Sequence, residues 1–179
     1  LIRFRGAQRN LSVFVAHAPT ADATEVYREE FYTSFNDFLS SSWESDTRVT
    51  LMDANAGPGT DRQDLSHIIG PHGVPFPRDP SKDPACLRFT QFCADADFCI
   101  GHTWFAHKQR HKLTFYPNEG AGSPKDIDHI LIDGRSSSCL EDVKVIPELV
   151  ISTSETLVQG EVAGHRAVMA KLHCKLKKI

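Results

Sequence analysis

The sequence lacks the features that mark membrane-spanning, secreted and strongly basic proteins. No apolar run approaches the roughly 18 residues that a membrane span needs, and no signal-peptide pattern opens the chain. The formal net charge is −3, so no overall positive field draws the molecule to nucleic acid or anionic lipid. We therefore expect an intracellular protein that does not bind a membrane, in the nucleus or the cytoplasm, with an organelle left open.

Paired cysteines are also lacking. The five cysteines are odd in number and include no CxxC pair, which argues against a disulfide framework and against a zinc site. We expect them to be reduced thiols that mostly fill the core. They are Cys86, Cys93, Cys99, Cys139 and Cys174.

Length and composition are those of one globular domain spanning residues 1–179. A chain of 179 residues buries roughly 70% of its unfolded surface. The hydrophobic content of 40% and the charged content of 24% are near globular averages. There is no internal repeat that would indicate a solenoid or a propeller.

Hydrophobic periodicity predicts a chain with two helices among several strands. The first helix is predicted to carry its apolar face on Tyr27, Phe31, Phe35, Phe38 and Leu39, and the second covers residues 85–95. The predicted strands cover residues 1–5, 11–17, 48–53, 98–105, 112–116, 127–132, 143–148 and 165–176. Residues 54–84 form a long segment rich in Gly, Pro and Asp, and loops of that length are usually functional or mobile.

Polar residues stand at the tips of four predicted strands whose inner faces are otherwise apolar. They are His17 after residues 11–15, Asp53 and Asn55 after residues 49–51, Asp128 before residues 130–132, and His165 before residues 167–169. If these strands lie side by side, the polar residues converge on one rim. An ordinary turn remains the alternative for Asp53 and Asn55, because Asp and Asn favour turns.

Such a rim has the groups that phosphodiester hydrolysis needs. A carboxylate that binds an imidazole orients it and favours its charged form, which stabilises negative charge on a phosphate. At about 4 Å and an effective dielectric near 20, this pairing amounts to roughly 4 kcal/mol of Coulomb energy before desolvation. A second carboxylate positions or deprotonates water, and an amide binds a phosphoryl oxygen. The reaction also favours a hard cation such as Mg²⁺.

Nine short motifs then resemble one known family in their order along the chain. They are HAP (17–19), DANA (53–56), GTD (59–61), GPHG (70–73), FC (92–93), HTWF (102–105), LTFYP (113–117), IDHILI (127–132) and GHRAVMAKL (164–172). This order is similar to that of the endonuclease/exonuclease/phosphatase family. It most resembles the apurinic-type endonuclease domains of LINE retrotransposons and the craniofacial-development-protein-2-like sequences related to them.

The resemblance implies an α+β fold, a DNase I-like four-layer α/β/β/α sandwich with its active site at one rim. It also implies Mg²⁺ dependence and a nucleic-acid phosphodiester as substrate. By the same resemblance, Asp53 orients the attacking water, Asn55 holds the phosphate, and Asp128 pairs with His165. His17 stands where the family usually has a phosphate-contacting tyrosine. Asp53 is the one residue that we expect at a metal.

Departures from the family pattern matter as much. Gly164 replaces the aspartate of the family's SDH motif, and His102 replaces the asparagine of its NTxF motif. The chain matches the C-terminal two-thirds of the family domain, so we expect a fold that is incomplete at the N-terminus. The early strands that supply an asparagine and the main metal-binding glutamate have no counterpart.

Two functional hypotheses follow. The preferred one is a catalytically impaired pseudonuclease of retrotransposon origin, which needs no cofactor and serves as a binding or structural module in an assembly. The alternative is an active Mg²⁺-dependent endonuclease that nicks DNA or RNA, completed by a missing N-terminal part or by a partner chain. Since an incomplete sandwich exposes apolar surface, we expect a protein partner over the region of Leu1 to Val15.

The remaining candidate contacts are basic. His102, Lys108, Arg110 and Lys112 are the expected substrate-binding residues, the last three in the loop KQRHK (108–112). A solvated hairpin tip is the alternative for this loop. We expect the other histidines to be surface or loop residues and not ligands: His67, His72, His107, His111, His129 and His173.

Overall fold

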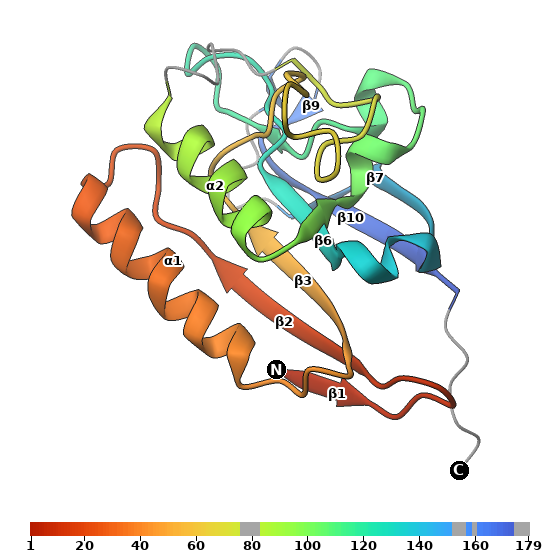
Figure 1. The fold of residues 1–179 in the computed structure, drawn as a ribbon. Coiled ribbons are helices and arrows are strands. Elements are labelled where there is room, and N and C mark those ends of the chain that lie inside the picture. The colour runs from red at the N-terminus through yellow and green to blue at the C-terminus, as the bar shows by residue number, and fades with distance from the viewer. Residues whose placement is uncertain (76–82, 152–156, 159–160, 174–179) are drawn as a thin grey trace.

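The computed structural model describes residues 1–75, 83–151, 157–158 and 161–173. Within these residues two β-sheets pack against each other, and two α-helices lie on the outside (Figure 1). The strands are β1 (Ile2–Phe4), β2 (Leu11–His17), β3 (Thr47–Asp53), β4 (Phe98–Ile100), β5 (Phe115–Tyr116), β6 (Asp128–Asp133), β7 (Leu140–Ile151), β8 (Leu157–Val158), β9 (Glu161–Val162) and β10 (Gly164–Leu172).

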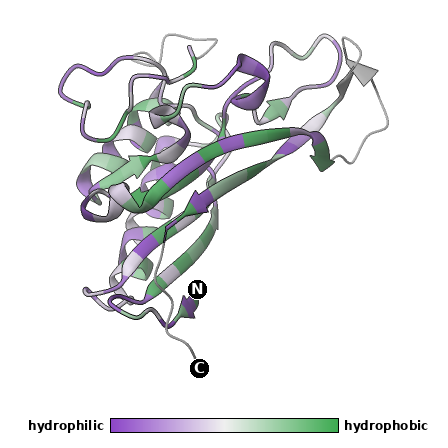
Figure 2. Ribbon diagram, turned by 90° about the vertical axis from the view of Figure 1, so that its right-hand side faces the viewer, coloured by the Kyte–Doolittle hydropathy of each residue, from purple (hydrophilic) through white to green (hydrophobic). Residues whose placement is uncertain are grey.

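The first sheet has the order β1-β2-β3-β6-β4. Strands β2 and β3 are parallel, whereas the other neighbours in this sheet are antiparallel. The second sheet has the order β5-β10-β7, and β8 pairs with β9 in a separate ribbon. Strands β7 and β10 form a long antiparallel pair, which Figure 2 shows curving away from the helical layer.

The helices α1 (Glu25–Ser40) and α2 (Pro84–Asp95) begin at residues suited to capping. The side chain of Thr24 accepts the backbone N–H of Tyr27 at the start of α1. The Asp83 carboxylate accepts the N–H of Ala85 and Cys86 at the start of α2, and Pro84 occupies the first turn, where its missing N–H costs nothing.

Both helices cover the same face of the first sheet. Their aromatic side chains, such as Tyr32 and Phe92, pack on Phe14, Met52 and Leu131 of the strands. The opposite face of this sheet packs on the second sheet through a smaller cluster. That cluster comprises Val49, Cys99, Ile130, Ile132 and Val143, with Val168, Ala170 and Leu172 of β10 at its edge.

The predicted α+β fold class is therefore confirmed, as two facing sheets with helices outside. In the described part of the chain, both α-helices lie on the first sheet, so three of the four expected layers are present. Among the same residues, no helix is long and apolar enough to cross a membrane. Cys86, Cys93 and Cys99 are buried in the core, as expected, whereas Cys174 lies outside the described residues.

Several predicted elements differ from those observed. The buried face of α1 consists of Arg28, Tyr32, Phe35 and Leu39. The prediction was right for Phe35 and Leu39, but Tyr27 and Phe38 are exposed. The predicted strand 98–105 ends at Ile100 and continues as a 3₁₀ helix, η2 (Gly101–Trp104). Two further 3₁₀ helices are η3 (Gln109–His111) and η4 (Gly134–Cys139).

The predicted apolar inner face of β2 and β3 is also only partly buried. Val49 is buried, but the side chains of Val15 and Leu51 are 68% and 39% exposed. They lie near the strand ends, where the second sheet does not cover the first. The open end of this face becomes a groove beside the functional site.

Candidate functional site

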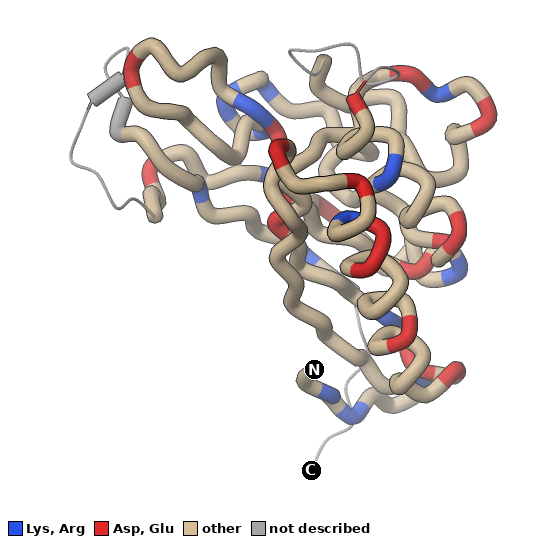
Figure 3. Tube along the Cα trace, turned by 90° about the vertical axis from the view of Figure 1, so that its left-hand side faces the viewer, with Lys and Arg blue, Asp and Glu red and all other residues tan. Residues whose placement is uncertain are grey.

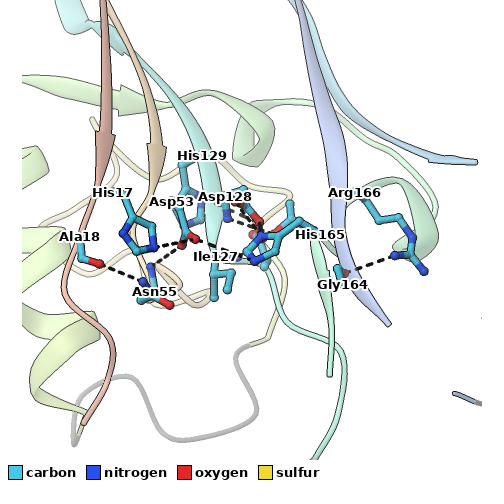
Figure 4. Close-up of polar contacts among 12 residues, drawn as sticks. His17, Ala18, Asp53, Asn55, Ile127, Asp128, His129, Gly164, His165 and Arg166 are labelled. Carbon is cyan, nitrogen blue, oxygen red and sulfur yellow. Dashed lines mark hydrogen bonds and ion pairs between the residues drawn. The ribbon is translucent and has the colours of Figure 1, made fainter. Parts of the chain in front are cut away.

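Strand pairing places three of the predicted residues in one row. His17 of β2 is the register partner of Asp53 in β3, and Asp53 is in turn the partner of Asp128 in β6. The second sheet brings His165, near the start of β10, to the same row (Figure 4). The expected meeting of strand tips at one rim is thus present in the structure.

Asp128 and His165 form the central pair of the site. Nδ1 of His165 lies 3.1 Å from Oδ1 and 3.0 Å from Oδ2 of Asp128. The other ring nitrogen, Nε2, lies 4.0 Å from Oδ2 of Asp53. The hydrogen bond to Asp128 raises the pKa of His165 above its usual value, so the imidazolium form is favoured at neutral pH.

Asp53 is held from two sides. Its Oδ1 accepts the backbone N–H of Asn55 at 3.0 Å, and its Oδ2 lies 3.4 Å from Nε2 of His17. Burial, reinforced by the Asp128 carboxylate, raises the pKa of Asp53 above its usual value. A carboxylate with a raised pKa is a better proton acceptor than an exposed one.

Asn55 adopts a left-handed backbone conformation with φ 49°, which Asn tolerates better than most residues. Its side-chain nitrogen donates to the carbonyl oxygen of Ala18 at 2.9 Å. This hydrogen bond ties the segment after β3 to the segment after β2. The side-chain amide nitrogen of Asn55 is therefore already hydrogen-bonded within the protein. Its predicted role, to hold the phosphate, remains a prediction.

Thr114 is a positioning residue that sequence reasoning did not select. Its hydroxyl oxygen accepts the N–H of Ile127 at 2.9 Å and of Asp128 at 3.0 Å. Its carbonyl oxygen accepts the N–H of Arg166, beside His165. Thr114 thus connects the two segments that carry the Asp–His pair, and the LTFYP motif was the available signal.

An open groove with a volume of about 400 Å³ adjoins the row. Asp53, Asp128 and His165 contribute its polar wall. Its apolar wall includes Val15, Leu51, Ile130, Ile151, Ala167 and Val168. The groove therefore combines acid–base groups with apolar surface from both sheets.

The three central side chains also have suitable positions for a cation. One ligand atom from each of Asp53, Asp128 and His165 lies within 4.8 Å of the others. The carboxylate oxygens are the hard donors that Mg²⁺ prefers, and Mg²⁺ is usually held by only one or two carboxylates plus substrate phosphates. Asp53 fits that requirement better than Asp128, since His165 already binds the Asp128 carboxylate.

The predicted substrate-binding residues differ in how exposed they are. Lys108 and Arg110 are exposed, and their contact with nucleic acid remains a prediction. Lys112 is only 8% exposed, and its ammonium donates to the carbonyl oxygen of His72. His102 is 2% exposed. Both side chains are therefore largely shielded, and their contact with a nucleic-acid backbone also remains a prediction.

No family model and no curated protein matches the chain. A 3'-5' exonuclease, NExo, from Neisseria meningitidis has a similar structure, with a TM-score of 0.59 and 16% identity over 93% of this chain and 62% of its own. Another similar structure is 3' phosphatase NExo from Neisseria bound to product DNA hairpin, with a TM-score of 0.59 and 17% identity over 95% and 63%.

The catalytic domain of APE2 from Xenopus laevis is also similar, with a TM-score of 0.56 and 16% identity over 97% of this chain and 54% of that chain. The fold is DNase I-like. The chain spans less than two thirds of the length of each of these three structures. The special closeness to LINE endonucleases and to craniofacial-development-protein-2-like sequences remains a prediction.

Proposed function

We propose that this chain carries the acid–base and phosphate-binding part of a Mg²⁺-dependent phosphodiester hydrolase that acts on nucleic acid. The observation that supports the proposal is the meeting of Asp53, Asp128 and His165 from two different sheets. The contacts among Asp53, Asp128 and His165 hold these side chains in positions that suit the reaction. The DNase I-like fold supports the same class of chemistry only by analogy.

In this proposal His165 and Asp53 have complementary tasks. His165, kept protonated by Asp128, places positive charge against the phosphate oxygens as the attacking water adds to phosphorus. Asp53 orients that water and accepts its proton, which its raised pKa favours. The bond between water oxygen and phosphorus forms, the bond to the leaving oxygen breaks, and that oxygen takes a proton from solvent. Bound Mg²⁺, held by Asp53 and the phosphate, would neutralise part of the phosphate charge.

The acidic charge of the helical layer disfavours the approach of nucleic acid from that side. Helix α1 carries Glu25, Glu29, Glu30 and Asp37, and Figure 3 shows acidic residues along the helical layer. A polyanion is repelled there. The exposed Lys108 and Arg110 are the proposed backbone contacts.

A pseudonuclease of retrotransposon origin is the second candidate, and two observations favour it. Both carboxylates of the site already contact imidazoles, at His17 and His165. Gly164 provides no carboxylate where the resembling family has one. In this case the site binds phosphate without cutting it, and a protein partner covers the apolar region around Leu1 to Val15.

Nicking of supercoiled plasmid in Mg²⁺ or Mn²⁺ distinguishes the two candidates. We expect nicking by the native chain that falls about 10²- to 10⁴-fold in Asp53→Ala and in His165→Ala, since each removes a positioned acid–base or charge-stabilising group. His107→Asn is the matched control, because His107 also contacts an aspartate, Asp142, at 2.6 Å, but outside the site.

Absence of nicking by the native chain in both metals would overturn the hydrolase proposal. If DNA still bound and His165→Ala weakened that binding, the second candidate would stand. A Gly164→Asp variant is a poor test of a lost carboxylate. Gly164 has a φ of 123°, which strains any residue with a side chain.

A further inference from the structure

A second group of ionisable side chains lies buried near the site. His102 belongs to η2, Asp126 precedes β6, and His129 is the second residue of β6. Their exposed fractions are 2%, 3% and 1%. The prediction that His129 is a surface or loop residue was therefore wrong. Strand alternation directs His129 away from Asp128, toward the helical side of the sheet.

The three side chains meet around a small volume. Nε2 of His102 lies 2.6 Å from Oδ2 of Asp126, and Nδ1 of His129 lies 3.8 Å from Oδ1 of Asp126. The imidazole rings are stacked, with centroids 5.1 Å apart. One ligand atom from each residue lies within 4.8 Å of the others.

These polar atoms have no hydrogen-bond partner among the residues that the structure describes. They are both ring nitrogens of His102, both carboxylate oxygens of Asp126, and Nδ1 of His129. The close contact between His102 and Asp126 is not aligned as a hydrogen bond. Since buried polar groups in native proteins are almost always satisfied, this concentration of unsatisfied atoms requires an explanation.

The tautomer of His129 is set by its other nitrogen. Nε2 lies 2.8 Å from the carbonyl oxygen of Ala56, so it must carry the proton. The lone pair of Nδ1 then points into the cluster. Burial lowers the pKa of His129 below its usual value, which favours the neutral ring that a metal needs. A backbone carbonyl that orients a histidine in this way is a common outer partner of metal ligands.

We propose that His102, Asp126 and His129 bind a Zn²⁺ ion. Two imidazoles and one carboxylate are ligands that suit zinc, and a water completes a four-coordinate site. Mg²⁺ is excluded as the preferred ion because it favours oxygen ligands. The cation would take one atom from each residue, so it would satisfy three of the five unpaired atoms and offset the charge of Asp126.

Charge compensation by Lys112 is a different explanation for the buried cluster, and the experiment must distinguish it from metal binding. Its side chain is buried, and the Asp126 charge favours its protonated form against the lowering of its pKa by burial. In this explanation the Lys112 ammonium, and not a metal ion, compensates the negative charge of Asp126. It leaves the lone pair of His129 unused, however.

A metal here would stabilise the segments that build the neighbouring site. It would join η2 and Asp126, two residues before β6, to β6 itself, which carries Asp128. Through His129 it would also fix Ala56, which follows Asn55. The proposal does not depend on hydrolase activity, and its readout is metal content.

The test uses the full chain, unfolded with chelator and refolded with or without Zn²⁺ or Co²⁺, because a closed site exchanges metal slowly. We expect one equivalent of zinc by elemental analysis, and visible Co²⁺ absorption typical of nitrogen and oxygen ligands. His102→Asn and Asp126→Asn should each weaken binding by more than about 100-fold, the upper range for losing only an outer partner. His107→Asn and His165→Ala should bind normally.

Refolding of the native chain to the same stability with no bound zinc or cobalt would overturn the proposal and favour Lys112. Loss of the metal in His165→Ala, with retention in His102→Asn, would also overturn it by moving the ion to the groove. If the variants do not fold, ¹⁵N NMR of the native chain decides. Zinc must shift Nδ1 of His129, and an unchanged Nδ1 resonance contradicts the site.

Discussion

At the scale of single residues, one hydrogen bond sets the charge of the candidate hydrolytic site. Asp128 holds Nδ1 of His165 and keeps the imidazole protonated to higher pH than a free histidine. Asp53 has a weaker influence, from 4.0 Å. The imidazolium form is thus favoured before any ligand binds, as the proposed phosphate-binding role requires.

NMR titration of the His165 ring tests this arrangement. We expect its pKa to lie above the usual value of 6.5 and to fall in Asp128→Asn, because the charge-assisted hydrogen bond is lost. Asp53→Asn is the control and should lower the pKa less. An equal pKa in the native chain and in Asp128→Asn would show that the pair does not act as described.

The same shift has a definite sign for stability. A pKa raised by folding contributes stability that is complete below the unfolded value and is lost as pH rises through the folded pKa. The advantage of the native chain over His165→Asn, measured by denaturant unfolding, should therefore shrink between mildly acidic and alkaline pH. A constant difference across that range would contradict the assignment.

The spatial meeting of Asp53, Asp128 and His165 could be predicted because it follows from strand alternation, whereas their catalytic roles remain predictions. Asp53, Asp128 and His165 were found because each ends an apolar face at a strand tip, and the register brings those tips together. The buried position of His129 was missed because the prediction followed the face of the strand that carries Asp128, and His129 points to the opposite face. Asp126 pairs with His102 across 24 positions, and no local pattern indicates a contact so distant in sequence.

At the scale of elements, an ion pair between half-buried Arg48 and buried Asp133 joins the central strands β3 and β6. Asp133 accepts the backbone N–H of Arg48 at 2.8 Å and its Nε at 2.7 Å. The Arg48 guanidinium also lies over the Phe98 ring of β4. The pair thus connects three neighbouring strands at the end opposite the functional row.

We expect Asp133→Ala to lower the free energy of unfolding by about 3 kcal/mol, since it leaves Arg48 without its buried partner. The value is at the low end for buried pairs because the Arg48 side chain is 24% exposed. Glu29→Gln is the control at the surface pair with Arg88 and should cost less than about 1 kcal/mol. Similar losses in both variants, measured with urea, would contradict this role.

Helices and strands were predicted best where nearby residues in the sequence determine them. Strand β2 was predicted at its observed bounds, and β3 within one residue, because their apolar alternation is regular. The strand predicted at 98–105 stops at Ile100, where Gly101 approaches the carbonyl oxygen of Ile130 too closely for a Cβ atom. Tertiary packing of this kind overrides strand propensity. Part of the predicted C-terminal strand lies outside the described residues.

At the scale of the whole molecule, the two sheets are in contact at one end and separated at the other. The cluster around Val49, Ile132 and Val143 is closed, whereas the groove exposes Val15, Leu51 and Ile151. The overall sandwich was predictable from the motif order, but this opening was not. It depends on how far the second sheet extends over the first.

The open groove predicts that the chain on its own binds a hydrophobic dye and self-associates, because contiguous apolar surface favours contact. Val15→Lys should reduce both dye fluorescence and association, measured by analytical ultracentrifugation. It should change stability by no more than about 0.5 kcal/mol, since the side chain is already 68% exposed. Val26→Lys is the matched control: Val26 is 69% exposed, but it lies on α1, away from the groove.

A native chain that is a monodisperse monomer and binds no dye would remove the basis for a partner over this region. Equal effects of the two substitutions would mean that general charge, and not the groove, controls association.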